Sequence, residues 1–139
     1  MPELLAPAGN LDTAVAALEN GADAVYCGLK KFNARERSEN FTREDLSRLI
    51  RFARNNSKKI YVTFNTLIKD TEIEQVFDEL SFLDDVKPDG VIIQDLGVYY
   101  LLKNYFPRLD IHGSTQMAVH NSEGVKLLEQ MGFSRIILE

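Results

Sequence analysis

The sequence has few of the residues that form disulfides and structural metal sites. Its 139 residues include one cysteine, Cys27, and two histidines. A single cysteine excludes an internal disulfide and a CxxC metal site. With so few thiol and imidazole ligands, a structural zinc site is not expected. We therefore assign no metal ligands, and we expect no cofactor to be held within this chain.

Long apolar stretches are missing as well. No apolar run approaches the roughly 18 residues that a membrane span needs. The opening residues, Met1–Leu5, have neither the basic region nor the long apolar stretch of a signal peptide. Hydrophobic residues make up 45% and charged residues 27%, as in ordinary globular domains. We expect one soluble, cytoplasmic domain over residues 1–139, with no membrane partner.

Several motifs of known chemistry are absent. The first predicted turn, Ala6-Pro-Ala-Gly-Asn10, is neither a G-x-G-x-x-G fingerprint nor a P-loop. The sequence also has no G-x-S-x-G, no H-E-x-x-H and no cysteine–histidine pair. The common nucleotide-binding and hydrolase sites therefore find no support in local motifs.

The net charge of −5 conceals an uneven distribution. The window from Lys30 to Lys59 holds ten of the sixteen basic residues and four acids, which makes it +6, while the rest of the chain is −11. A basic stretch on an acidic protein is typical of a phosphate-binding surface. The simpler interpretation is an exposed helix face, because Arg48, Arg51 and Arg54 recur at helical spacing.

Short apolar runs alternate with amphipathic stretches along the whole chain. Because most of the runs lack a period of two, they are typical of strands buried on both faces of a parallel sheet. The predicted strands are residues 3–6, 24–27, 60–64, 90–94, 110–114 and 135–138. Five helices are expected between them, opening at Asn10, Thr42, Thr71, near Val98 and near Ser122. Thr71 and Glu74 have the spacing of a capping box.

Strict alternation fits two architectures, an open doubly wound sheet and a (β/α)8 barrel. The absence of a glycine-rich first turn argues against an open nucleotide-binding sheet. We predict an α/β fold, a parallel TIM-type (β/α) barrel truncated to about six strands and five helices, with the strands in sequence order. We also expect Ile93 and Ile111 to point into a partly open barrel interior.

In such a barrel, function lies at the carboxyl ends of the strands. Those positions are rich in amides, hydroxyls and guanidiniums, which bind planar polar groups by hydrogen bonding. The segment from Gly28 to Phe41 is long for a βα connection, as functional loops often are. The candidate substrate-binding residues are Asn10, Asn33, Arg35, Arg37, Asn65, Gln94 and Thr115.

Proton-transfer groups are scarce at the same positions. Asp95, Ser114 and Gln116 are the candidate catalytic residues. His112 lies two residues from Ser114 and would share its face of the strand. Neighbours on one face of a strand are about 7 Å apart, however, which is too far for a direct hydrogen bond.

Several segments carry a resemblance to a known family. They are Glu3-Leu-Leu-Ala-Pro-Ala-Gly-Asn10, Gly21-Ala-Asp-Ala-Val-Tyr26, Phe32-Asn-Ala-Arg35, Asn40-Phe41, Lys59-Ile-Tyr-Val-Thr-Phe-Asn-Thr66 and Ser114-Thr-Gln116. In this order they resemble the N-terminal part of the bacterial collagenase-like peptidases of family U32. The resemblance implies a (β/α) barrel. It also implies one of two activities, because some members are described as proteases and others as oxygen-independent hydroxylases of RNA or ubiquinone precursors.

Three functions follow as hypotheses. The first is a peptidase that hydrolyses peptide bonds. The alternative is the N-terminal segment of an iron–sulfur-dependent hydroxylase that modifies tRNA or rRNA, whose cluster ligands, by the resemblance, would lie outside this chain. In that case Lys30, Lys31, Arg35 and Arg37 would bind phosphates, and Phe32 and Phe41 would stack on a base. The third is an inactive fragment of a larger enzyme.

Six strands cannot close a barrel of eight-strand radius. The first and sixth predicted strands should then keep unpaired edges, which favour association. We therefore expect a homo-oligomer, and a peptide or an RNA as the substrate.

Overall fold

The computed structural model describes residues 1–35 and 39–138 and contains six parallel strands. They lie in the order β1-β2-β3-β4-β5-β6, so each strand pairs with the next in sequence. The strands are β1 (Leu5–Pro7), β2 (Ala24–Gly28), β3 (Lys59–Phe64), β4 (Gly90–Ile93), β5 (Ile111–Gly113) and β6 (Arg135–Ile136). The predicted barrel-type order is confirmed, and an open-sheet order is excluded.

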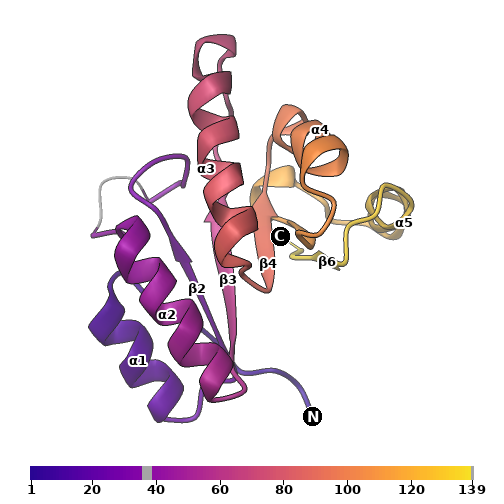
Figure 1. The fold of residues 1–139 in the computed structure, drawn as a ribbon. Coiled ribbons are helices and arrows are strands. Elements are labelled where there is room, and N and C mark those ends of the chain that lie inside the picture. Colours follow the sequence, from indigo (N-terminus) through magenta and orange to yellow (C-terminus); the bar gives the residue numbers. More distant parts are fainter. Residues whose placement is uncertain (36–38, 139) are drawn as a thin grey trace.

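Five α-helices lie around the outer side of the curled sheet (Figure 1). They are α1 (Leu11–Glu19), α2 (Arg43–Asn55), α3 (Ile73–Val86), α4 (Leu96–Tyr105) and α5 (Ser122–Gln130). Two short 3-10 turns, η1 (Asp70–Glu72) and η2 (Thr115–Met117), complete the elements of the described residues. The sheet does not close within these residues, because β1 and β6 are its two edges.

Helix starts follow the predicted capping residues with one exception. The side chains of Asn10 and Thr42 accept hydrogen bonds from the backbone N–H groups of Thr13 and Asp45, as expected of N-caps. The predicted capping box of Thr71 and Glu74 is wrong. The chain first makes the turn η1, and the Glu72 carboxylate accepts from the Lys69 backbone N–H at 2.8 Å, so α3 begins only at Ile73.

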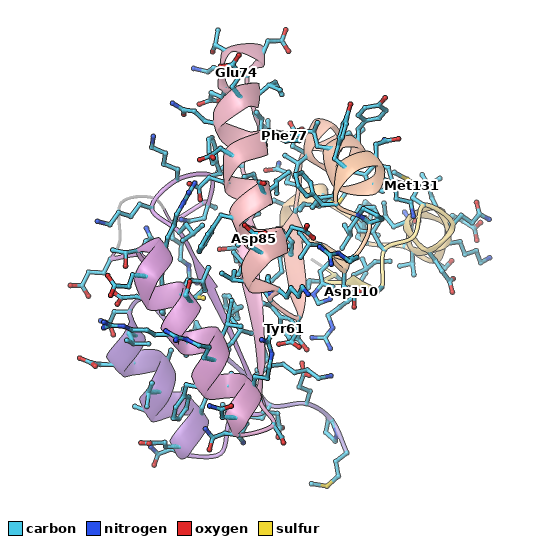
Figure 2. All side chains as sticks on the ribbon, viewed as in Figure 1. Tyr61, Glu74, Phe77, Asp85, Asp110 and Met131 are labelled. Atoms are coloured by element: carbon cyan, nitrogen blue, oxygen red, sulfur yellow. The ribbon has the colours of Figure 1, made fainter. Side chains whose placement is uncertain are left out.

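The main core lies between the outer face of the sheet and the helices. Val25, Val62 and Ile93 point into it and are fully buried. Ile111 belongs to the same core, so the expectation that Ile93 and Ile111 face the barrel interior is wrong. Helices α3 and α4 also contact each other: the Phe77 ring, labelled in Figure 2, lies 5.4 Å from that of Tyr105.

The inner face of the sheet carries the alternate residues. Ala24, Tyr61 and Ile92 are buried there, with Leu5, Tyr26 and Ile137 packed against them. Leu5 begins β1 and Ile137 follows β6, so the sheet curls far enough for its two edges to share one apolar cluster. This cluster separates the amino-terminal end of the half-barrel from its carboxyl-terminal end.

The amino-terminal end is crossed by four polar side chains that we call the basal network: Glu3, Tyr61, His112 and Arg135. The Glu3 carboxylate accepts from Arg135 Nη1 at 2.8 Å and from the Tyr61 hydroxyl at 2.8 Å. The Arg135 guanidinium lies over the Tyr61 ring, 4.7 Å from its centre, and the His112 ring meets the same tyrosine edge-on at 4.9 Å. The basal network joins the segment before β1 to β6.

Candidate functional site: a cavity at the carboxyl ends of the strands

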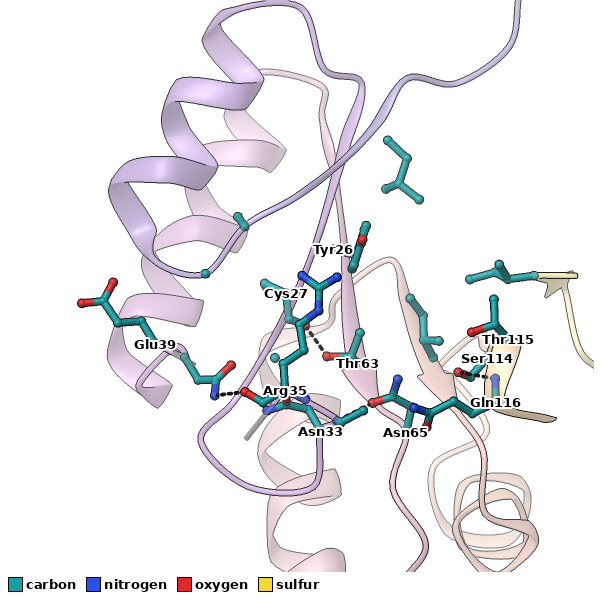
Figure 3. A pocket seen from close by; sticks show the side chains of 18 residues that line it. Tyr26, Cys27, Asn33, Arg35, Glu39, Thr63, Asn65, Ser114, Thr115 and Gln116 are labelled. Atoms are coloured by element: carbon teal, nitrogen blue, oxygen red, sulfur yellow. Dashed lines mark hydrogen bonds between the residues drawn. The ribbon is translucent and has the colours of Figure 1, made fainter. Parts of the chain in front are cut away.

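A cavity of about 490 Å³ opens at the carboxyl-terminal end of the half-barrel (Figure 3). Its base is apolar and is formed by the inner-face residues Leu5, Tyr26, Ile92 and Ile137. Its wall is polar and comes from the ends of β1, β2, β3 and β5 and from the loop after β2. The polar wall residues are Asn33, Arg35, Glu39, Asn40, Thr63, Asn65, Ser114, Thr115 and Gln116.

The loop after β2 forms one wall and is held in place by its own side chains. The Phe41 backbone N–H donates to the Gly28 carbonyl at 3.0 Å, which closes the loop at its base. Asn33, which is 2% exposed, donates from Nδ2 to the Leu29 carbonyl and accepts at Oδ1 from the Arg35 backbone N–H at 2.9 Å. This wall is therefore pre-formed in the described part of the loop.

Glycine is required where this loop approaches the sheet. A Cβ atom on Gly28 would lie 2.7 Å from Thr63 Oγ1 and 2.8 Å from the Asn33 side chain. Thr63 in turn donates to the Cys27 carbonyl at 3.1 Å. Any larger residue at position 28 would clash with Thr63 and Asn33 and so displace one of these two wall residues.

The two loop phenylalanines anchor the loop. Phe32 is 6% exposed and lies 5.2 Å from Phe64, ring centre to ring centre, and Phe41 is 1% exposed. Their faces are covered by the protein, so they offer no surface on which a base could stack. Tyr26 is the aromatic residue that borders the cavity in the described part of the chain.

Polar side chains on β3 and β5 form the opposite wall. Asn65 Oδ1 accepts from the Ala34 backbone N–H at 3.0 Å, which ties the end of β3 to the loop. Ser114 Oγ accepts from the Gln116 backbone N–H at 3.2 Å and so starts the turn η2. Figure 3 shows the Gln116 side chain extending from this turn toward Asn65.

Six of the ten predicted site residues line the cavity, namely Asn33, Arg35, Asn65, Ser114, Thr115 and Gln116. Gln94 lies behind the wall and donates to the Gln116 carbonyl at 3.3 Å. Asn10 caps α1 and donates to the Glu39 carboxylate at 2.9 Å. Arg37 lies outside the described residues.

Asp95, a candidate catalytic residue, lies outside the cavity wall. Its Oδ1 accepts from the Val98 backbone N–H at 3.0 Å, which makes it the N-cap of α4. Its Oδ2 accepts from the Ile68 backbone N–H at 3.1 Å. Both carboxylate oxygens therefore accept hydrogen bonds from backbone N–H groups, so in this geometry Asp95 stabilises the start of α4 and the segment at Ile68.

No serine–histidine pair forms among the described residues. His112 lies in the basal network, below the apolar base of the cavity, and its ring leaves no space for a Cβ on Gly90. Burial, together with the charge of Arg135, lowers the pKa of His112 to about 4. Burial also raises the pKa of the Cys27 thiol to about 12, so at neutral pH it is protonated and a poor nucleophile.

The basic residues fall into two groups. On α2, Arg43 pairs with Asp78 and Glu79, Arg48 pairs with Glu44, and Arg51 lies on the exposed face. Arg54 donates to the carbonyls of residues 86 and 87. The second group, Lys30, Lys31 and Arg35, lies exposed on the loop beside the cavity.

Residues 9–139 match the model of peptidase family U32. The chain belongs to this family. The resemblance drawn from the sequence segments is therefore confirmed.

Two curated relatives of this chain carry different names. An uncharacterized protease of Methanocaldococcus jannaschii is 40% identical over 99% of this chain and 33% of its own length. The tRNA hydroxylation protein P1 of Bacillus subtilis is 34% identical over 99% of this chain and 32% of its own length. The chain thus spans about a third of the length of these relatives.

A solved structure of a U32 peptidase has the same fold. It superposes with a TM-score of 0.76 at 13% sequence identity, and the match covers 100% of this chain and 59% of that one. At this identity the likeness supports the fold alone. Within the described residues, no helix is both long and apolar enough to cross a membrane.

The iron–sulfur cluster implied for some U32 proteins does not fit the described residues. Such a cluster is held by several cysteine thiolates, and this sequence contains Cys27 alone. That thiol is buried and protonated. The described residues also contain no group of three or more histidine, cysteine or acidic side chains placed to hold a metal ion.

The sequence interpretation missed the apolar base and the carboxylate of the cavity. Tyr26 and Ile92 each occupy the middle of a run buried on both faces, so nothing in the run marks which side chains point inward. In the sequence Glu39 is one of the four acids of the basic window, whereas in the structure it borders the cavity and accepts from Asn10. The unusual length of the segment from Gly28 to Phe41 is the sequence feature that indicates this part of the cavity wall.

Proposed function

We propose that this chain forms the substrate-binding half of a barrel enzyme that hydroxylates RNA, and that the cavity receives one base of the RNA. The cavity itself carries the proposal. It combines an apolar base, suited to the faces of a planar ring, with a wall of amides, hydroxyls and a guanidinium, suited to its edge. Among the described residues, no hydroxyl or thiol of its wall is hydrogen-bonded to a histidine or a carboxylate.

The positive charges beside the cavity also support RNA as the ligand. The whole chain is acidic, at −5, yet Lys30, Lys31 and Arg35 are exposed on the loop that borders the cavity. Cations beside a ring-binding cavity are suited to the phosphates that flank a base. The name of the Bacillus subtilis relative adds tRNA hydroxylation as the activity. Since tRNA is a cytoplasmic molecule, the proposal keeps the cytoplasm as the compartment.

The proposal assigns binding to this chain and oxidation to another part of the enzyme. Hydroxylation of a base replaces a C–H bond by a C–O bond and therefore needs an oxidant and a redox group. The described residues do not fit an iron–sulfur cluster, so we propose that its ligands lie outside this chain. We accordingly expect the chain alone to bind RNA and to lack activity.

Peptide hydrolysis is the second candidate, because the Methanocaldococcus jannaschii relative is named a protease and is 40% identical. An amide-rich wall also suits the backbone of an extended peptide. Ser114 is a hydroxyl of the wall, but its oxygen accepts from the Gln116 backbone N–H, and no base contacts it in the described residues.

The two candidates are separated by assaying the whole natural protein for both activities. For hydroxylation, tRNA from a strain lacking the gene is digested to nucleosides and compared with wild-type tRNA by mass spectrometry. For proteolysis, the purified protein is incubated with casein and with denatured collagen. A hydroxylated nucleoside that disappears in the deletion strain, with no cleavage, supports our proposal. Cleavage that is lost in Ser114→Ala, with unchanged tRNA, overturns it.

Oligomerisation of the isolated chain stays a prediction. Strands β1 and β6 are edges within the described residues, and Leu138 beside β6 is exposed. Exposed edges and apolar side chains favour association. We expect a homo-oligomer in light scattering at micromolar concentration, and a cooperative monomer would contradict the prediction.

A further inference from the structure

The carboxamide side chains that line the cavity are of two kinds. Asn33 and Asn40 hold the loop: Asn33 is bonded at both ends of its amide, and Asn40 Nδ2 donates to the Arg35 carbonyl at 3.1 Å. Asn65 and Gln116 differ because each keeps part of its hydrogen-bonding capacity for the cavity. The first pair positions the wall, and the second pair can contact a ligand.

The orientation of the Asn65 amide is fixed by a backbone donor. Its Oδ1 accepts from the Ala34 N–H at 3.0 Å, and only the oxygen end of an amide can accept. The branch of the carboxamide that faces away from the Ala34 N–H is therefore the nitrogen, Nδ2. Nδ2 has no hydrogen-bond partner among residues 1–35 and 39–138. Asn65 Nδ2 thus offers a donor of fixed position to a bound molecule.

Gln116 offers an amide of undetermined orientation. Its backbone is fixed at both ends, since the N–H donates to Ser114 Oγ and the carbonyl accepts from Gln94 Nε2. Its carboxamide makes no hydrogen bond within the described part of the chain, and it extends toward Asn65 (Figure 3). A carboxamide can turn over and present either its oxygen or its nitrogen.

We propose that Asn65 and Gln116 recognise the hydrogen-bonding edge of the bound ring, with Asn65 Nδ2 as a fixed donor and Gln116 as an adaptable neighbour. The inference rests on the proposed function, because it takes the ligand to be a base of RNA. The ring must present a carbonyl oxygen or an unprotonated ring nitrogen to Asn65. An amino group at that point would face another donor and leave both unpaired, which is the strongest basis for rejection in a polar site.

Asn65→Asp tests the fixed donor. One carboxylate oxygen can keep the bond from the Ala34 N–H, so the loop stays tied, while the second replaces the Nδ2 donor by an acceptor. Asn104→Asp is the matched control, because Asn104 lies on α4, away from the cavity, and the substitution adds the same charge. The whole natural protein is given a mixture of RNA oligonucleotides that differ only in the target base, and the products are quantified by mass spectrometry.

Asn65→Asp should change the ratio of kcat/KM between bases that present a carbonyl and bases that present an amino group by about tenfold or more, toward the amino group. Asn104→Asp should leave the ratio as in the wild type. A ratio within about twofold of the wild type in Asn65→Asp, with turnover retained, overturns the inference. A loss of structure alone would lower both rates and would not invert the preference.

A second measurement does not depend on RNA hydroxylation. Uridine and cytidine are titrated at millimolar concentration into protein labelled with ¹⁵N, and the side-chain amide resonances of Asn65 and Gln116 are followed. We expect both resonances to shift, while the side-chain amide of Gln75, an exposed glutamine of α3, serves as the reference and stays in place. Shifts without any hydroxylated product would overturn the proposed function and keep the inference. Unchanged resonances with both nucleosides would overturn the inference.

Discussion

The two ends of the half-barrel are built from different chemistry. At the amino-terminal end, the basal network pairs the partly exposed charges of Glu3 and Arg135, and the Tyr61 ring lies between the Arg135 guanidinium and the His112 ring. At the carboxyl-terminal end, the cavity wall is mostly neutral, with amides and hydroxyls whose bonds are only partly satisfied within the protein. The charged pair at the amino-terminal end is satisfied within the protein, and His112 Nδ1 beside it is buried without a hydrogen-bond partner among the described residues. At the other end, the amides of Asn65 and Gln116 border an open cavity.

This difference matches a general division of labour along the axis of (β/α) barrels. In barrels of this type the amino-terminal face serves stability and the carboxyl-terminal face serves chemistry. The pKa values follow the same division. Burial acts to raise the pKa of Glu3, but hydrogen bonds from Arg135 and Tyr61 outweigh it and hold the pKa below its usual value. Burial, with help from Glu3, raises the pKa of Tyr61 to about 12.

The largest effect on stability is expected when the central ring of the basal network, that of Tyr61, is removed. Tyr61→Ala should lower the free energy of unfolding by about 3–5 kcal/mol, because it empties a buried site and removes the contacts to Glu3 and Arg135. Gln116→Ala in the cavity should change it by about 0.5 kcal/mol or less. Urea denaturation measures both. Equal losses in the two variants would show that stability is not concentrated at the basal network.

Acid should weaken the basal network through His112. The groups that face it are Arg135 on β6, Lys59 and Tyr61 on β3, Asp110 before β5, and Glu3. Its pKa is about 4 in the folded protein and about 6.5 in the unfolded chain, so only the unfolded chain takes up a proton between these values. The contribution of His112 is therefore complete above pH 6.5 and is lost as pH falls to 4. After a reduction for partial solvent screening, the free energy of unfolding lost through His112 between pH 6.5 and pH 4 amounts to about 2–3 kcal/mol.

Two variants isolate this effect in urea titrations at several pH values. His112→Leu should flatten the pH dependence between 6.5 and 4, whereas His120→Leu, at an exposed site, should leave it unchanged. Glu3 acts in the same direction at lower pH, because its depressed pKa makes stability fall as the carboxylate is protonated. A wild-type protein equally stable at about pH 7 and about pH 4.5 would contradict the prediction.

The smallest expected effect concerns the charge beside the cavity. Arg35→Ala should weaken RNA binding several-fold and make the slope of log K against log salt shallower by about one, because one phosphate contact is lost. Replacing Arg35 and Arg37 together should change the slope by about two. Arg51→Ala on α2 is the control, since it removes the same charge from an exposed helix face. An unchanged slope in the double variant would leave the loop without a role in phosphate binding.

The order of strands was predictable because it depends on patterns that recur along the whole chain. Alternating apolar runs and capped helices, together with the family resemblance, led to six parallel strands in sequence order. The inward-facing residues were not predictable. In β4, for example, Val91, Ile92 and Ile93 are all apolar and buried, so no alternation of polarity marks Ile92 as the residue that faces inward.

The polar residues at strand ends were only partly predictable for a related reason. A strand end in this fold is also a helix start, and the residues favoured at N-caps are the same asparagines, aspartates and serines that bind ligands. Asn10 and Asp95 are the N-caps of α1 and α4, while Asn65 and Gln116 border the cavity. Only the hydrogen bonds of each side chain distinguish the two roles.

The contact between Glu3 and Arg135 joins residues 132 positions apart in the sequence. Every strand pair, by contrast, links neighbours in the chain, so each βα unit can pair as soon as it has been synthesised. The ion pair has to wait until β6 has left the ribosome, and contacts of such long range form late in folding. Until then Glu3 has the Tyr61 hydroxyl of β3 as its partner in the basal network, and its pairing with Arg135 marks the moment at which the sixth strand has been added to the sheet.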